Sequence, residues 1–197
     1  MFFRAEFNMW GRGNLSYERT QRVKIISCFA AGAIAVMMLS GATGNRKVTQ
    51  NKLSPPADTS LTTATGKVIT IEYNAPSARG RKVEGGLIPN GSVWRLGADS
   101  ATTLTTDADL TIGDLSVPKG VYTLYLVGGE SEWKLVVNKQ TGQWGTVYDE
   151  SKDLGRTSMK VAKLPAAAET LKITLTNSGA LEVVWGNSRA SVAVKPS

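Results

Sequence analysis

The sequence has no histidine and only one cysteine, Cys28, among its 197 residues. A disulfide bond within the chain needs two cysteines and is therefore excluded. Zinc and copper sites, the Ser-His-Asp triad and the Cys-His pair all depend on histidine or on several cysteines, which the chain lacks. The chemistry that remains uses carboxylate, hydroxyl, amine and phenol groups, and we expect no metal site and no cofactor.

Long apolar runs are also scarce, and the one at residues 25–39 follows three basic residues between positions 19 and 24. A basic segment, an apolar run of about 7–15 residues and small residues after it are typical of a secretory signal peptide. The sequence thus predicts a signal peptide over residues 1–42, cleaved after Ala42, and a periplasmic or secreted protein of the bacterial envelope. An uncleaved anchor is the alternative, although a membrane span takes about 20 apolar residues. Membrane contact is expected only through this segment before cleavage.

The excess of positive charge is small outside the N-terminal segment. The whole chain carries a formal charge of +7, but residues 43–197 hold 18 basic and 14 acidic side chains without a lysine or arginine run. A nucleic-acid-binding domain normally shows a clustered basic patch. We therefore expect no nucleic-acid partner, and the oligomeric state stays open.

Alternation of apolar and polar residues dominates the rest of the chain. Residues 43–60 lack hydrophobic periodicity and are expected to be a flexible linker, followed by a single domain over 61–197. Residues 68–73 alternate, residues 121–127 are apolar on both faces, and the threonine-rich residues 101–106 are typical of an edge or solvent-backed strand. Short helical candidates are confined to residues 149–156 and a turn around 165–169. We expect an all-β fold, an antiparallel β-sandwich of roughly seven to nine short strands.

The stretch RGRKVEGGLIPNGSVWRLGADSATT, residues 79–103, combines three arginines, a lysine and a tryptophan with many glycines. Guanidinium groups bind carboxylates and phosphates through paired hydrogen bonds, and Trp94 is suited to stack on a sugar or another ring. The stretch has no GKS/T element, which excludes a nucleotide P-loop. In the alternative interpretation, each arginine pairs with an acid such as Asp99 or Glu84, and Trp94 fills the core.

A second glycine-containing segment, residues 138–156, carries aromatic residues followed by three acids, Asp149, Glu150 and Asp153. The acids lack the spacing of a calcium loop, so we interpret them as helix-capping residues. Two carboxylates among Asp99, Asp149 and Asp153 would alternatively suit a glycosidase, whose mechanism depends on their separation. The candidate ligand-binding residues from both segments are Arg79, Arg81, Trp94, Arg95, Asp99, Trp144 and Tyr148.

Four motifs in order resemble the bacterial family known as domain of unknown function 2911. They are SPPADTS at 54–60, RGRK…GGL.P.G.VWR..A..ATT at 79–103, IG…P.G.Y.L at 112–124 and NKQTGQWGT.YDE..DL.R at 138–156. The resemblance runs from about residue 53 to residue 194. It implies an exported, β-rich domain and supplies no activity.

We therefore expect an envelope protein with a noncatalytic, ligand- or glycan-binding module. Its expected partner is a small anionic or sugar-containing ligand, with Trp144 and Tyr148 forming a second wall of the site. Two other functions stay open, a carboxylate-dependent glycan hydrolase and a structural protein-contact domain. An exposed apolar patch of several hundred Å² would indicate the last of these.

Overall fold

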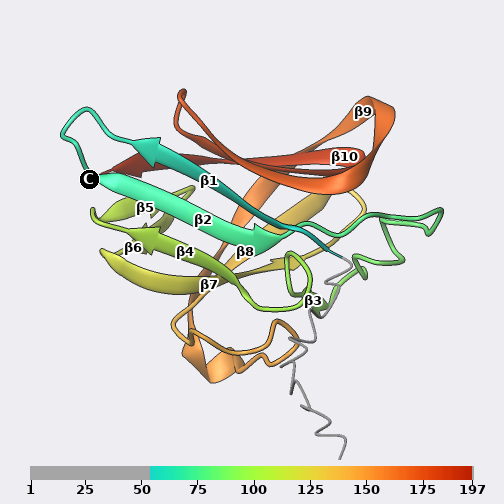
Figure 1. The fold of residues 1–197 in the computed structure, drawn as a ribbon, viewed down its shortest axis with the longest axis horizontal. Helices are drawn as coiled ribbons and strands as arrows, with labels where there is room; N and C mark the ends of the chain where they lie inside the picture. Colours follow the sequence, from blue (N-terminus) through green and yellow to red (C-terminus); the bar gives the residue numbers. More distant parts are fainter. Residues whose placement is uncertain (1–53, 197) are drawn as a thin grey trace, which may run out of the picture. The chain divides into compact units, whose positions relative to one another are not determined.

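Antiparallel strands make up nearly all the regular structure in the computed structural model, which describes residues 54–196. They join into one ten-stranded sheet in the order β1-β2-β4-β7-β8-β9-β10-β5-β6, with β3 paired to β7 off this path (Figure 1). The strands are β1 (Pro56–Thr62), β2 (Val68–Asn74), β3 (Val93–Trp94), β4 (Thr102–Thr106), β5 (Leu110–Ile112), β6 (Leu115–Val117), β7 (Gly120–Val127), β8 (Glu132–Asn138), β9 (Asp153–Thr176) and β10 (Ala180–Pro196). The expected signal peptide, its cleavage site and Cys28 lie outside the described residues. No helix within residues 54–196 has the length and apolar character to span a membrane.

Alternation along the strands explains how the core forms. In β2, Ile69 and Ile71 are fully buried, whereas Glu72, between Ile71 and the buried Tyr73, is exposed. Strand β7 lies between β4 and β8, and both Leu124 and Tyr125 are buried there, on opposite faces. The all-β class and the central position expected for residues 121–127 are confirmed.

The edge position expected for the threonine-rich strand is wrong, because β4 pairs with β2 on one side and β7 on the other. Its end residues Thr102 and Thr106 are buried with satisfied hydroxyl groups. Thr102 Oγ1 donates to the Leu96 carbonyl at 2.8 Å, and Thr106 Oγ1 donates to the Ala108 carbonyl at 2.7 Å. Buried hydroxyls that find such partners are compatible with a central strand.

The helix expected at residues 149–156 is also wrong, since only a single 3₁₀ turn, η1 (Glu150–Lys152), forms there. The Asp149 carboxylate caps this turn by accepting from Ser151 N, and the chain enters β9 at Asp153. Residues 165–169 belong to β9 rather than to an isolated turn. At the other end of the domain, β1 begins at Pro56, inside the segment expected to be a linker.

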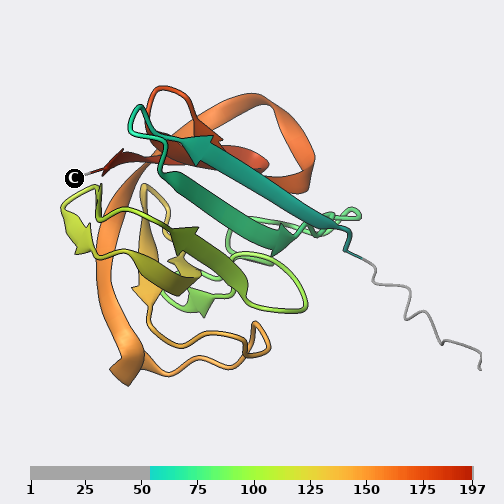
Figure 2. The ribbon, with the colours of Figure 1, turned by 60° about the vertical axis from the view of Figure 1, so that its left-hand side comes forward.

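The two long strands β9 and β10 explain why hydrogen bonds connect all strands into one open sheet instead of two separate ones. The first part of β9 pairs with β8, and its later part pairs with β10. Register shifts around Gly186 accompany a bend, and Figure 2 shows β9 curling over β1 and β2. The bent part contacts these strands: Ile173 N donates to the Tyr73 hydroxyl at 3.0 Å, and Leu175 N donates to Thr59 Oγ1 at 3.0 Å. Most of the buried hydrophobic side chains, including Tyr73 and Ile173, belong to one core cluster.

Candidate functional site

A cleft of about 500 Å³ opens beside β3, at the end of the domain where the long loop between β2 and β3 runs. The loop between β3 and β4 and one side chain of β10 complete its walls. Five of the seven candidate ligand-binding residues line it. The lining residues are Ser54, Pro76, Ser77, Arg79, Arg81, Leu87, Trp94, Arg95, Gly97, Ala98, Asp99 and Trp185.

Backbone strain is concentrated in the walls of this cleft and directly beside them. Among the described residues, those other than glycine with positive φ are Arg79 at 51°, Leu96 at 44° and Asp99 at 57°. This left-handed region is costly for residues with a side chain, most of all for a bulky one such as leucine. Strained residues of this kind persist where the surrounding structure holds them, and they cluster at functional sites.

Two arginines of the cleft are held by defined contacts. The backbone N–H of Arg79 donates to Glu169 Oε1 at 2.7 Å. Arg81 donates from Nε to the Ala78 carbonyl and from Nη2 to the Ser77 carbonyl, both at 2.9 Å. These two bonds fix the Arg81 guanidinium group, and its remaining N–H groups are available for another acceptor.

Arg95 differs from them. It is half-buried, and among the described residues its side chain has no hydrogen-bond or ion-pair partner. The expected pairing with Asp99 or Glu84 does not occur for this residue. Glu84 Oε1 accepts instead from Asn187 N at 2.7 Å and from Ser188 Oγ at 2.8 Å. Arg95 therefore presents to the cleft a guanidinium group without a hydrogen-bonded or ion-paired partner among the described residues.

Trp94 lies between the core and the cleft. Its ring stacks on Trp185 with centroids 5.4 Å apart and an interplanar angle of 24°. Trp185 is buried, and its Nε1 donates to the Glu169 carbonyl at 3.0 Å. Trp94 packs against the core but is only partly buried, and it also lines the cleft.

Trp144 and Tyr148 do not line the cleft. Trp144 is 52% exposed and lies next to it, because its backbone pairs with Ser100. Gly145 then packs onto the cleft residues: a Cβ at this glycine would lie 2.9 Å from the Asp99 carbonyl oxygen and 3.1 Å from Arg95 Cδ. Only glycine permits this approach, a role that the sequence analysis missed although Gly145 lies within one of its motifs.

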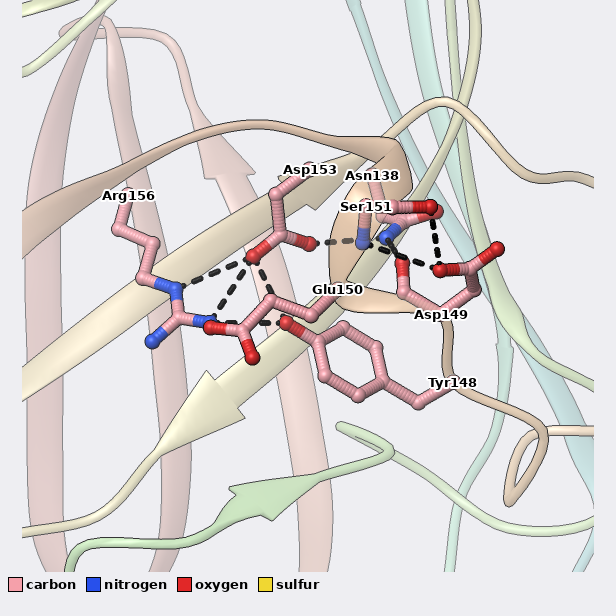
Figure 3. A network of polar contacts seen from close by, with 7 residues as sticks. All are labelled: Asn138, Tyr148, Asp149, Glu150, Ser151, Asp153 and Arg156. Atoms are coloured by element: carbon pink, nitrogen blue, oxygen red, sulfur yellow. Dashed lines mark hydrogen bonds and ion pairs between the residues drawn. The ribbon is translucent and has the colours of Figure 1, made fainter.

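Tyr148 belongs to a separate set of polar contacts, here called the loop network and shown in Figure 3. Arg156 is at its centre. The Nη2 atom of Arg156 lies 2.7 Å from Glu150 Oε1, 2.8 Å from the Tyr148 hydroxyl and 3.0 Å from Asp153 Oδ2. The remaining members of the network are Asn138, Asp149 and Ser151.

The loop network shifts the pKa values of its members. Burial and the hydrogen bond to Asp153 raise the pKa of Tyr148 to about 12. Burial acts to lower the pKa of Arg156, but the bonds to Asp153 and Tyr148 outweigh it and raise that pKa overall. Hydrogen bonds from Ser151 lower the pKa of Asp149. These shifts keep Tyr148 protonated and Arg156 charged. Both side chains are already bonded to Asp153 within the protein.

Acidic side chains do not gather into a metal site in the part of the chain that the structure describes. Both carboxylate oxygens of Asp153 accept hydrogen bonds from the protein. Oδ1 accepts from Asn138 Nδ2 at 2.8 Å, and Oδ2 accepts from the Tyr148 hydroxyl at 2.7 Å. The Asp149 carboxylate accepts from Ser151. These contacts agree with a capping and loop-anchoring role for the acids.

The fold and the site together define an all-β domain with a tryptophan-lined cleft that carries arginines. The chain belongs to the family described as Protein of unknown function (DUF2911), which matches it over residues 54–194. This match confirms the family resemblance seen in the sequence motifs. Comparisons with curated proteins and with solved structures find no match.

Proposed function

We propose that this protein is an exported, noncatalytic binding module whose cleft takes a small anionic or sugar-containing ligand. The observation that carries the proposal is the half-buried Arg95, which lines the cleft without a partner among the described residues. A partly buried charge without a directly paired counter-charge is costly, and a ligand carboxylate or phosphate bonded to Arg95 would relieve that cost.

The shape and walls of the cleft support this proposal. Its volume of about 500 Å³ lies within the range of about 300–1,000 Å³ that is usual for small-molecule sites. Arg81 is fixed in place before any ligand arrives, which lowers the entropy lost on binding. Trp94 offers a ring face beside these arginines, and Trp144 stands at the rim.

The positions of the carboxylates favour binding over hydrolysis. Asp99 is the only acidic side chain among the described residues that line the cleft. Asp149 and Asp153 are engaged in the loop network. A glycosidase of the usual kind needs two carboxyl groups flanking one scissile bond, about 5–10 Å apart.

Export rests on residues 1–42, which have the composition of a signal peptide. We place the mature protein in the periplasm or outside the cell, with the curled sheet acting as a two-layered β-sandwich. N-terminal sequencing of the protein recovered from the periplasm or medium should give Thr43 as the first residue. Recovery of the intact chain in the membrane fraction would contradict cleavage after Ala42.

Binding is tested by calorimetric titration of the purified protein with galacturonate, glucose and inorganic phosphate. We expect an anionic probe to bind, and Arg95→Ala to weaken it about tenfold or more with little change in melting temperature. Lys172→Ala, at an exposed position on β9 outside the cleft, is the matched control. If Arg95→Ala unfolds the domain, or leaves the binding of every probe unchanged, the cleft is not the site.

A further inference from the structure

The cleft is the first of three neighbouring hollows. A second hollow of about 240 Å³ shares Arg81 with the cleft, and a third of about 540 Å³ shares Lys82, Glu84 and Asn187 with the second. Their combined volume exceeds the upper end, about 1,000 Å³, of ordinary small-molecule pockets. We call this continuous surface, from Arg95 past Arg81 and Lys82 to Lys163, the groove.

Cations occur along the whole length of the groove. Arg95 lines its first hollow, Arg81 stands between the first and second, and Lys82 lies between the second and third. Lys163 lines the third hollow. Lys82 and Lys163 are exposed and form no ion pair with another of the described residues. Each can therefore meet a ligand group at a different distance from Arg95.

Acids alternate with these cations. Glu84 and Glu169 line the second hollow, and Glu130 lines the third. A ligand with phosphates along its whole length would meet repulsion from these carboxylates. A hydroxyl group, by contrast, both donates to a carboxylate and accepts from a lysine or arginine. Residues 54–196 hold 15 basic and 14 acidic side chains, which is far from the excess of positive charge that nucleic-acid binding favours.

Resting on the proposed function of the cleft, we propose that the groove binds an acidic oligosaccharide several sugar rings long. A carboxylate of the sugar chain pairs with Arg95, and one ring lies against Trp94. The hydroxyls of the following rings bond to the alternating charges of the second and third hollows, and Lys163 contacts the far end of the ligand.

The test is calorimetric titration of the purified protein with malto-oligosaccharides of one to eight rings whose terminal ring is glucuronate, so that each oligomer carries a single carboxylate. Affinity should rise with chain length and then level off when the groove is filled. Lys163→Gln should weaken the long oligomers about threefold to tenfold and leave the monomer unaffected. Arg95→Gln should weaken every length, and Lys172→Gln, outside the groove, should change none.

Other outcomes separate this inference from the function of the cleft. Equal affinity for monomer and octamer, with no effect of Lys163→Gln, would overturn the groove and leave a cleft for a small ligand. Failure of all these oligosaccharides, and also of galacturonate, glucose and inorganic phosphate, to bind would overturn both. Tighter binding of neutral malto-oligosaccharides, of polyglutamate or of a single-stranded oligonucleotide of matched length would overturn the assignment to an acidic sugar.

Discussion

Two segments of this domain resemble each other in composition and differ in what their arginines do. Both the cleft segment and the segment of the loop network combine glycines, aromatic rings, acids and arginine. In the loop network, Arg156 contacts Glu150, Asp153 and Tyr148 within 3.0 Å. In the cleft, Arg95 contacts none of the described acids. The contacts that an arginine makes, rather than its neighbours in sequence, distinguish a structural arginine from one whose guanidinium group is unpaired.

The two regions are also connected in space. The loop network anchors the end of the long loop between β8 and β9, and the earlier part of the same loop carries Gly145 against Arg95. The ion pairs of the loop network therefore help to hold the loop that packs against the unpaired Arg95. Variants on either side can separate these contributions.

The largest effect is expected from Trp185→Ala, on the cleft side. Trp185 is 1% exposed and supports Trp94 from below, so its truncation should cost about 3–5 kcal/mol of unfolding free energy. Urea denaturation measures this loss. The exposed Trp144 is the matched control, and Trp144→Ala should change stability by less than about 0.5 kcal/mol. Equal losses for both variants would contradict the burial described for Trp185.

A smaller loss is expected on the network side from Asn138→Ala. Asn138 is fully buried, and its side chain donates to the Asp149 carbonyl and to Asp153 Oδ1 and accepts from Gln140 N. Removing it leaves Asp153 Oδ1 and Gln140 N without a protein partner and takes one of two donors from the Asp149 carbonyl, at a cost of about 1–3 kcal/mol. Unfolding in urea should show this loss. Faster hydrogen exchange should be confined to the loop between β8 and β9, and exchange spread evenly over the sheet would contradict a local anchoring role.

A still smaller effect is expected from pH at Tyr148. Its pKa is raised from 10 to about 12, so between these pH values the folded state binds more protons than the unfolded state. The contribution of Tyr148 is therefore complete below pH 10 and is lost as the pH rises towards 12. The urea concentration at the midpoint of unfolding should therefore fall between pH 9 and pH 11.5, and Tyr148→Phe should make this fall smaller. Tyr122 and Tyr125, whose pKa values are also raised, should retain their share of that fall. An identical fall in both proteins would contradict the shift at Tyr148.

Strand positions were the most predictable feature from the sequence, because alternation such as that of Ile69 and Ile71 depends only on local geometry. The central position of β4 was not predictable, since it depends on long-range pairing and on partners for the Thr102 and Thr106 hydroxyls. The single sheet likewise depends on how far β9 and β10 continue past their bend.

The candidate site was predictable in part for a similar reason. Arg79, Arg81, Trp94, Arg95 and Asp99 lie in one stretch, and a single loop region brings them to one cleft. Tyr148 was separated from them because its partners, Asp153 and Arg156, are settled by how β9 pairs with β8. Composition alone could not distinguish these two environments.

The most direct measurement compares Arg95→Gln with Arg156→Gln in unfolding free energy and in affinity for galacturonate. If Arg95 is available to a ligand and Arg156 is a structural residue, Arg95→Gln should leave stability within about 0.5 kcal/mol of the parent protein and weaken binding about tenfold. Arg156→Gln should lower stability by about 1 kcal/mol and weaken binding less than Arg95→Gln does. A loss of stability in Arg95→Gln as large as that in Arg156→Gln, with galacturonate affinity unchanged, would contradict the distinction between the two arginines.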